Sequence, residues 1–204
     1  MPTVNSKYKF FNSASDYSCR NRYSAYNMRI SAEGVTAIEL LVVMAIAAIL
    51  LAVAVPSFVG ITQGNRLAAE INAFSGDVQF ARTEAVKEGL PVSICASTNG
   101  TSCLGVNTWN KGWIVFSDPN GNQTVDAGDT VLRKQASWTS TDTFTASSNT
   151  TAFSYSRDGF AIALPGTITW TLHTQPVNAS ASRCLAINII GRLQVQSPGT
   201  GSCT

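Results

Sequence analysis

The sequence predicts an α+β protein in which one long N-terminal helix packs on an antiparallel β-domain. Two observations support this fold class. Residues 40–65 carry no charge, and an apolar stripe at helical spacing continues from them as far as residue 85. After Pro91 the chain changes to short β-branched segments separated by Gly-, Asn- and Ser-rich turns. A helix followed by a run of strands is typical of an α+β protein.

The first half of this helix, residues 35–60, is expected to lie in a membrane. Residues 40–59 are almost all Leu, Val, Ile, Ala and Met, and about 20 helical residues span ~30 Å of hydrocarbon. A cleaved secretory signal is the alternative, but the run is too long for one and no A-x-A site closes it. Pro56, followed by Gly60 and Gly64, predicts a kink or a weak point near the outer end.

The second half, residues 61–89, is expected to be an amphipathic helix that packs on the following domain. Its apolar stripe has alternating steps of four and three residues, and it consists of Leu67, Ile71, Phe74, Val78, Ala81 and Ala85. Gly89 and Pro91 then end the helix. The stripe is interpreted as core and not as a ligand surface.

Residues 90–204 are expected to form the β-domain. Hairpin turns are expected at residues 157–159 and 191–192, and a surface loop at the Ser/Thr-rich residues 136–151. The predicted strands cover residues 92–96, 113–117, 130–133, 153–155, 167–172, 185–190 and 193–196.

The net charge of +2 belongs to the N-terminal end of the chain. Residues 1–34 carry five Lys/Arg against two acids, whereas residues 35–204 carry nine against ten. A basic flank before an apolar span indicates a cytoplasmic N-terminal side. The nearly neutral remainder gives no strong field for nucleic acid or anionic lipid.

Five cysteines divide into Cys19 and a set of four beyond the apolar span. An even set in an exported domain favours disulfides, and three pairings are possible. The local pairs Cys95–Cys103 and Cys184–Cys203 are favoured, the second stapling the C-terminus to the domain. Zinc is the alternative, but the sequence has no C-x-x-C pair and a single histidine.

Glu39 stands at the membrane-entering end of the apolar run, where an unpaired carboxylate costs a few kcal/mol. Gly34 precedes it by five residues, which suggests a chain cut after Gly34 that uses its new amino terminus together with Glu39. This is chemistry of assembly. The sequence contains neither G-x-S-x-G nor H-E-x-x-H, and its single histidine, His173, is interpreted as structural, so no enzyme and no cofactor are predicted.

Residues 118–129 are rich in side-chain oxygens, and a calcium loop and a polar hairpin are the two interpretations. Against calcium, Gln123 stands where an EF-hand loop needs Gly, and the last position is Asp, not Glu. Asp, Asn and Gly are also the ordinary turn residues, which favours the hairpin. The calcium candidates are Asp118, Asn120, Asn122, Asp126 and Asp129.

These features together resemble the type IV pilins and type II secretion pseudopilins, and among them the GspH/FimT minor subgroup. Two segments carry the general resemblance, VTAIELLV at 35–42 after Gly34 and AVPSF at 54–58. The subgroup resemblance comes from NRL at 65–67, ARTEAVKEG at 81–89, GWIVFSD at 112–118 and VLR at 131–133. Val35 and Ala37 depart from the family, which usually has Phe and Leu there.

The resemblance implies cleavage by prepilin peptidase between Gly34 and Val35, and N-methylation of Val35. It also implies that Glu39 pairs with the terminal amine of a neighbouring pilin or pseudopilin subunit. The chain would sit in inner-membrane lipid as a single-pass protein with a periplasmic C-terminal domain, and would then enter a pilus or pseudopilus fibre. Residues 1–34 would be the leader, and Met28 is an alternative start that gives a leader of seven residues.

Three functions follow from the resemblance. The preferred one is a structural and initiating minor pilin of a type IV pilus, which serves biogenesis, twitching motility and adhesion. The alternative is a GspH-type pseudopilin of a type II secretion system. A DNA-binding pilin for transformation is disfavoured, because residues 191–194 are GRLQ and lack the second arginine of the G-R-x-R motif. Nucleic-acid binding is therefore expected to be weak and salt-dependent.

Overall fold

The computed structural model describes residues 34–201 and 203, so the predicted leader before Gly34, with Cys19 and Met28, lies outside the described residues. The chain divides into two units, with the boundary between Ala45 and Ile46. Helix α1, Ala37–Glu88, begins in the first unit and continues into the second. The helix ends at Gly89, whose left-handed backbone (φ 70°) lets its N–H bond back to the carbonyl of Ala85.

Two antiparallel sheets follow the helix, which confirms the predicted fold class. The first has five strands in the order β3-β2-β1-β5-β6, and the second has four in the order β4-β7-β8-β9. The strands of the first sheet are β1 (Val92–Ala96), β2 (Gly112–Ser117), β3 (Thr130–Ala136), β5 (Ala152–Tyr155) and β6 (Ala161–Ile162). Those of the second are β4 (Thr143–Ala146), β7 (Ile168–His173), β8 (Arg183–Ile187) and β9 (Leu193–Gln196).

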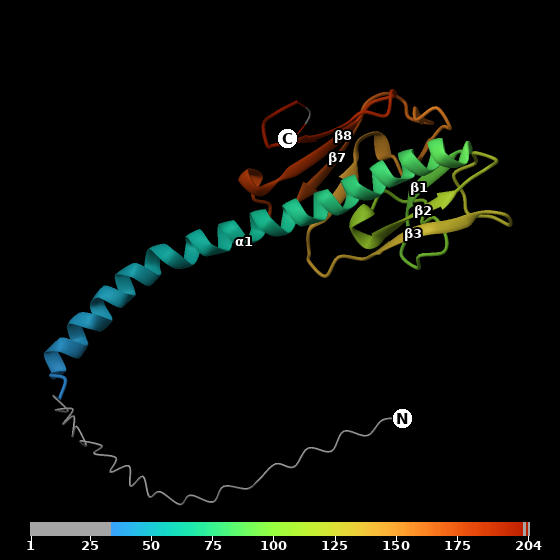
Figure 1. Ribbon diagram of the computed structural model, residues 1–204. Helices are drawn as coiled ribbons and strands as arrows, with labels where there is room; N and C mark the ends of the chain where they lie inside the picture. Colours follow the sequence, from blue (N-terminus) through green and yellow to red (C-terminus); the bar gives the residue numbers. More distant parts are fainter. Residues whose placement is uncertain (1–33, 202, 204) are drawn as a thin grey trace, which may run out of the picture. The chain divides into compact units, whose positions relative to one another are not determined.

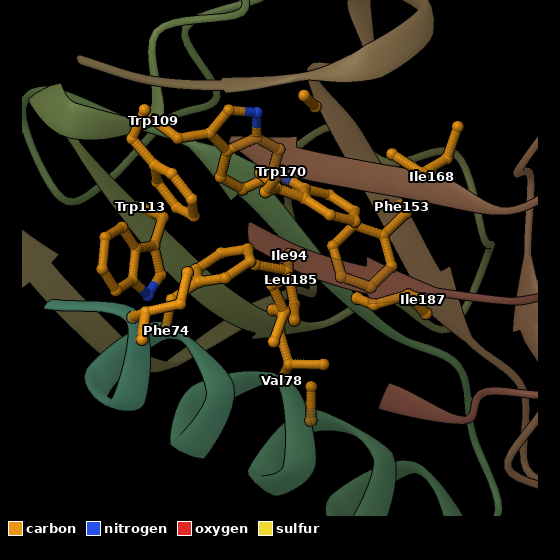
Figure 2. Packing of buried hydrophobic residues seen from close by; sticks show 14 of the residues in the cluster. Phe74, Val78, Ile94, Trp109, Trp113, Phe153, Ile168, Trp170, Leu185 and Ile187 are labelled. Atoms are coloured by element: carbon orange, nitrogen blue, oxygen red, sulfur yellow. The ribbon is translucent and has the colours of Figure 1, made fainter. Parts of the chain in front are cut away.

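The second half of α1 packs along both sheets (Figure 1). All six residues of the predicted apolar stripe are buried, and they share one core cluster with side chains of the two sheets. Figure 2 shows Phe74 and Val78 pointing from the helix toward aromatic side chains of the sheets. The prediction that this stripe is core is confirmed.

Phe74 is the centre of the aromatic part of the core. Its ring meets the rings of Trp113 and Phe144 edge-on, at centroid distances of 5.0 Å, and that of Trp109 at 5.4 Å. Edge-to-face pairs add to the free energy of burial because the positive ring edge faces the negative ring face. One helical side chain therefore connects the helix to both sheets.

The first sheet is buried on its other face as well. Cys95, Ile114 and Phe116 form a second, smaller cluster there, to which Cys103 and Val125 contribute. Residue 103 belongs to the segment after β1 and residue 125 to the segment after β2. These two polar segments therefore supply part of the apolar cover of the outer face, together with Val131 of β3 and Ala152 of β5.

The sequence interpretation was wrong for residues 136–151, which were expected to be a surface loop. They contain β4, which pairs with β7 and buries Phe144 and Ala146. The segment TFTA alternates polar and apolar side chains, and this period-two signal is short enough to be lost among Ser and Thr. The two-residue strand β6 was also missed, and β8 ends at Ile187, not at residue 190.

The two predicted hairpin turns are confirmed. Gly159 lies in the turn between β5 and β6, and Gly191 in the turn between β8 and β9. Both have positive φ, at 78° and 75°, in the region that favours glycine. A side chain on Gly191 would meet the carbonyl oxygen of Gly159 at 2.4 Å, so glycine allows the two turns to touch.

Candidate assembly site

The first turn of α1 places Thr36 and Glu39 together. Helix α1 starts at Ala37, and Thr36 caps it, because the backbone N–H of Glu39 donates to Thr36 Oγ1 at 3.3 Å. Thr36 and Glu39 have the T-x-x-E spacing of a capping box. A carboxylate in the first turn is also favoured by the helix dipole. Sequence reasoning missed the role of Thr36, although the spacing was visible.

Residues 34–62 are all exposed. This range contains most of the uncharged segment, from residue 40 to residue 62. Val35, Ile49 and Val53 are each more than two-thirds exposed. The helix is long and apolar enough to cross a membrane. An apolar surface of this extent needs lipid or other protein around it, because leaving it in water costs roughly 25 cal/mol per Å².

Pro56 lies inside α1, and the helix is continuous through it. Proline has no N–H, so the carbonyl one turn earlier loses its helical partner. Ser57 Oγ donates to the carbonyl of Val53 at 3.1 Å, and Thr62 Oγ1 donates to that of Val59 at 2.9 Å. The first contact precedes the glycine at position 60, and the second spans it. The kink at Pro56 stays a prediction.

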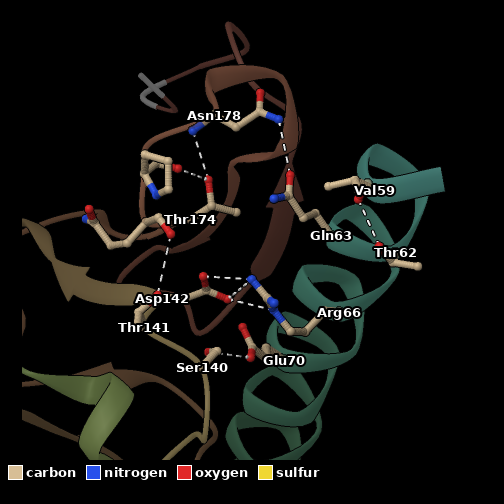
Figure 3. A network of polar contacts seen from close by, with 12 residues as sticks. Val59, Thr62, Gln63, Arg66, Glu70, Ser140, Thr141, Asp142, Thr174 and Asn178 are labelled. Atoms are coloured by element: carbon tan, nitrogen blue, oxygen red, sulfur yellow. Dashed lines mark hydrogen bonds and ion pairs between the residues drawn. The ribbon is translucent and has the colours of Figure 1, made fainter. Parts of the chain in front are cut away.

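A polar network fastens α1 to the β-domain where the buried stripe begins (Figure 3). Arg66 donates through Nε and Nη2 to the two oxygens of Asp142, both at 2.9 Å. Asp142 is fully buried, whereas Arg66 is partly exposed. A two-pronged pair of this kind fixes orientation as well as distance. Asn178 adds a weaker bond to Gln63, at 3.4 Å.

Glu70 lies one helical turn beyond Arg66 and faces the same acid. One of its oxygens accepts from Ser140 at 3.2 Å, and the other is buried without a partner in the part of the chain that the structure describes. Burial, followed by the charge of Asp142, raises the pKa of the Glu70 carboxyl above its usual 4.5. The contact between Glu70 and the segment before β4 joins residues 70 positions apart in the chain, so it could not be read from the sequence.

The structure pairs Cys95 with Cys103 and Cys184 with Cys203, the local pairing that the sequence favours. The first disulfide joins β1 to the segment that covers the outer face of its sheet. The second joins β8 to the residues after β9. Across residues 34–201 and 203, no three His, Cys, Asp or Glu side chains are grouped as metal ligands.

The side-chain oxygens of the segment 118–129 accept hydrogen bonds from groups of the same protein. Asp118 is buried and accepts from Ser93 Oγ and from the backbone N–H of Gln123, the latter at 2.9 Å. Asp126 accepts from the side-chain amides of Asn122 and Asn120, at 2.7 and 3.2 Å, and these bonds lower its pKa. These contacts fit the polar-hairpin interpretation, in which the segment satisfies its own polar groups.

His173 is half-buried at the end of β7, and its Nδ1 lies 2.8 Å from Ser182 Oγ. Ser182 also donates to the carbonyl of Asn178, at 3.3 Å. The imidazole therefore joins β7 to the start of β8. This is the structural position that the sequence interpretation gives to the histidine.

Comparisons with known proteins give one matching family and similar solved structures. The family described as type II transport protein GspH matches residues 70–191. The crystal structure of the type IV minor pilin FimU of Pseudomonas aeruginosa PAO1 has a TM-score of 0.55 at 22% identity, over 71% of this chain and 99% of that one. The minor pseudopilin EpsH of the Vibrio cholerae type 2 secretion system has a TM-score of 0.46 at 9% identity, over 65% and 98%.

The likeness to FimU shows the type IV pilin-like fold, a long N-terminal helix packed on antiparallel sheets. The family match covers more than half of the chain. The chain therefore belongs to the GspH family: it is a minor pilin or pseudopilin, a structural and non-enzymatic subunit of a type IV pilus or a type II secretion system.

Proposed function

We propose that this chain is a minor pilin of a type IV pilus, held in the inner membrane by residues 35–60 until it enters the fibre. One observation carries the proposal: an apolar helix segment that is exposed along its whole length, with Glu39 as its single carboxylate, in the first turn. Soluble domains rarely expose so much apolar surface unless it binds lipid or protein.

The role of Glu39 follows from the energy of a charge in an apolar bundle. A carboxylate that leaves water loses several kcal/mol of hydration, and it regains this only beside an opposite charge. Cleavage between Gly34 and Val35 creates an amino group at the end of the same segment. We infer that Glu39 of one subunit pairs with the methylated Val35 amine of the next.

The proposed organisation has four parts. Residues 1–34 are the leader, 35–60 the membrane and assembly half of the helix, and 61–89 its amphipathic half. Residues 90–204 form the disulfide-stapled periplasmic domain. Partners are prepilin peptidase, lipid and other pilin subunits.

The second candidate is a pseudopilin of a type II secretion system, which the family description favours. The subgroup motifs at 65–67 and 81–89 favour the pilus. Deleting the gene separates the two. Loss of surface pili and twitching with normal secretion supports the pilus, and the reverse result supports secretion.

The role of Glu39 can be tested with Glu39→Gln, because glutamine also suits the capping box but carries no charge. Breaking a buried ion pair costs roughly 3–5 kcal/mol, so recovery in sheared fibres should fall about 100-fold or more. Mass spectrometry should show that cleavage and N-methylation of the variant stay normal.

Thr36→Ala is the matched control, because it removes the cap and leaves the carboxylate. It should still enter fibres, at a cost of about 1 kcal/mol in helix stability. Normal recovery of Glu39→Gln in sheared fibres, or an equal defect in Thr36→Ala, would show that charge pairing is not the role of Glu39.

A further inference from the structure

A cavity lies between α1 and the turn that joins β8 to β9, away from the N-terminal segment. Its volume is about 290 Å³. This is near the lower end of the sizes of ligand pockets, and it suits one side chain better than a large ligand. The lining residues are Val78, Gln79, Arg82, Tyr155, Gly191, Arg192 and Leu193.

Two arginines line this cavity with unused hydrogen-bonding capacity. Arg82 donates from Nη1 to the carbonyl of Gly191, at 3.2 Å, and Arg192 lies next to that glycine. Neither guanidinium has an ion pair among residues 34–201 and 203. The nearby acid Glu84 is paired with Lys87, at 2.7 Å. The charge that faces the cavity is therefore positive.

Tyr155 adds a buried donor. Its side chain is fully buried, and its hydroxyl has no hydrogen-bond partner within the described residues. Burial raises the pKa of Tyr155 to about 12, although the charge of Arg82 opposes the rise. The phenol is thus neutral at physiological pH and can donate its proton. A buried hydroxyl without a partner costs free energy, and an acceptor entering the cavity would recover it.

Exposed apolar side chains lie in the two turns and on the helix that adjoin the cavity. Phe160 follows the glycine of one turn, Ile189 and Ile190 precede the glycine of the other, and Val86 lies one helical turn beyond Arg82. Each of these four side chains is at least half exposed. The turns are joined by the bond from the N–H of Ala161 to the carbonyl of Ile189, at 3.1 Å.

We propose that this cavity binds the carboxylate of an Asp or Glu side chain that a neighbouring subunit of the fibre presents between apolar residues. A carboxylate has two oxygens that can accept hydrogen bonds from Arg82, Arg192 and Tyr155 in the lining of this cavity, and its negative charge complements the two guanidiniums. The exposed apolar side chains that adjoin the cavity would be covered by the apolar neighbours of that acid. The site serves equally in a pilus and in a secretion pseudopilus.

A nucleic-acid backbone fits this surface less well. Phosphates along a strand are bound by cations spread over a groove, with aromatic side chains that stack on bases. Here two arginines line one small cavity, and the exposed apolar side chains of the adjoining turns and helix are three aliphatic residues and a single phenylalanine. The observations therefore favour a protein carboxylate.

The test uses the ¹⁵N-labelled full-length mature chain in detergent, titrated with sodium acetate against sodium chloride at equal ionic strength. The Gly191 amide and the Arg82 Nε–H should shift saturably, with a Kd on the order of 1–10 mM. Arg192→Gln should weaken acetate binding about tenfold, since bonds to charged groups are the strong ones. Arg157→Gln is the matched control, because this exposed arginine lies in the neighbouring turn outside the cavity, and it should bind acetate normally.

Tyr155→Phe separates binding from structure. Removing an unpaired buried hydroxyl should raise the thermal unfolding midpoint of the free protein and weaken acetate binding several-fold. A structural role for the hydroxyl would instead lower the unfolding midpoint. Absence of saturable shifts, or equal acetate binding in the Arg192→Gln variant, overturns the proposal.

Two further arms identify the source of the anion. A photo-cross-linker at Ile190 in assembled fibres should capture another subunit at a segment that contains an acid, and changing that acid to its amide should abolish the adduct. Tighter binding of a single-stranded oligonucleotide than of acetate, lost in Arg192→Gln, would assign the cavity to nucleic acid and reject our proposal. The acetate arm does not depend on fibre assembly, so it is unaffected if the proposed role of Glu39 fails.

Discussion

The two halves of α1 are both helical, but the first half is exposed whereas the second half buries one face. Residues 34–62 are exposed throughout, whereas Leu67, Phe74, Val78 and Ala85 are completely buried. The first half is apolar all round, and the second is apolar along one stripe. A stripe needs one partner, and the protein's own β-domain supplies it. A helix that is apolar on every side needs surroundings that the same chain does not supply.

The difference shows which contacts stabilise each half of the helix. The second half is stabilised in folding, through contacts within the subunit. The first half can be stabilised only by lipid or by other subunits. One continuous element thus combines a folding surface with an assembly surface, and the polar contacts of Arg66 mark where the second begins to pack.

The largest effect should come from Phe74→Ala, with Phe58→Ala as its counterpart in the exposed half. Phe74 is fully buried among aromatic rings, and Phe58 is 67% exposed. Removing a buried phenylalanine costs about 3–5 kcal/mol, whereas an exposed one changes stability by less than about 0.5 kcal/mol. Chemical unfolding in detergent, followed by tryptophan fluorescence, measures both. Equal losses in the two variants would break the comparison.

A smaller effect is expected at the point where the halves meet. Arg66→Gln leaves the buried carboxylate of Asp142 unpaired beside Glu70, at a cost of about 2–3 kcal/mol because Arg66 is partly exposed. Lys87→Gln breaks an exposed pair in the last turn of the same helix and should leave the unfolding midpoint unchanged. If the two variants unfold alike, the contact of Arg66 does not anchor the helix.

The smallest effect concerns pH. The folded pKa of Glu70 is raised by burial above the unfolded value near 4.5, so between these two values the folded state holds more protons. Stability should therefore fall as pH rises through this interval. Glu70→Gln should remove that fall, so the variant should match the native chain at pH 4 and exceed it at pH 7. Parallel melting curves from pH 4 to 7 would contradict the assignment.

Much of the helix could be predicted from sequence, because its signals are local. The spacing of Leu67, Ile71 and Phe74 depends only on the period of a helix, and the structure buries all three. The glycines at 159 and 191 were also readable, since positive φ favours glycine in any context. Thr36 carries an equally local capping signal, because it stands three residues before Glu39 in the T-x-x-E spacing.

Other features depend on contacts between distant residues. Nothing near Phe144 in the sequence indicates that β4 pairs with β7, because the burial that favours the pairing comes from Phe74 and from the second sheet. Asp142 looked like a loop residue until Arg66 was placed against it. A Ser/Thr-rich segment becomes a strand when the surrounding core supplies a surface for its few apolar side chains.

The amino-acid sequence by itself determined the fold class of this protein, the apolar segment that begins at a single acid, and the apolar stripe of the helix that faces the β-domain. These are properties of neighbouring residues, and a helix or turn expresses them wherever it lies. Only the tertiary structure decided which strands pair, how Arg66 is used, and that Arg82, Tyr155 and Gly191 meet around one cavity. Residues so far apart in the chain come together only through packing, since each contact depends on all the others that form the core.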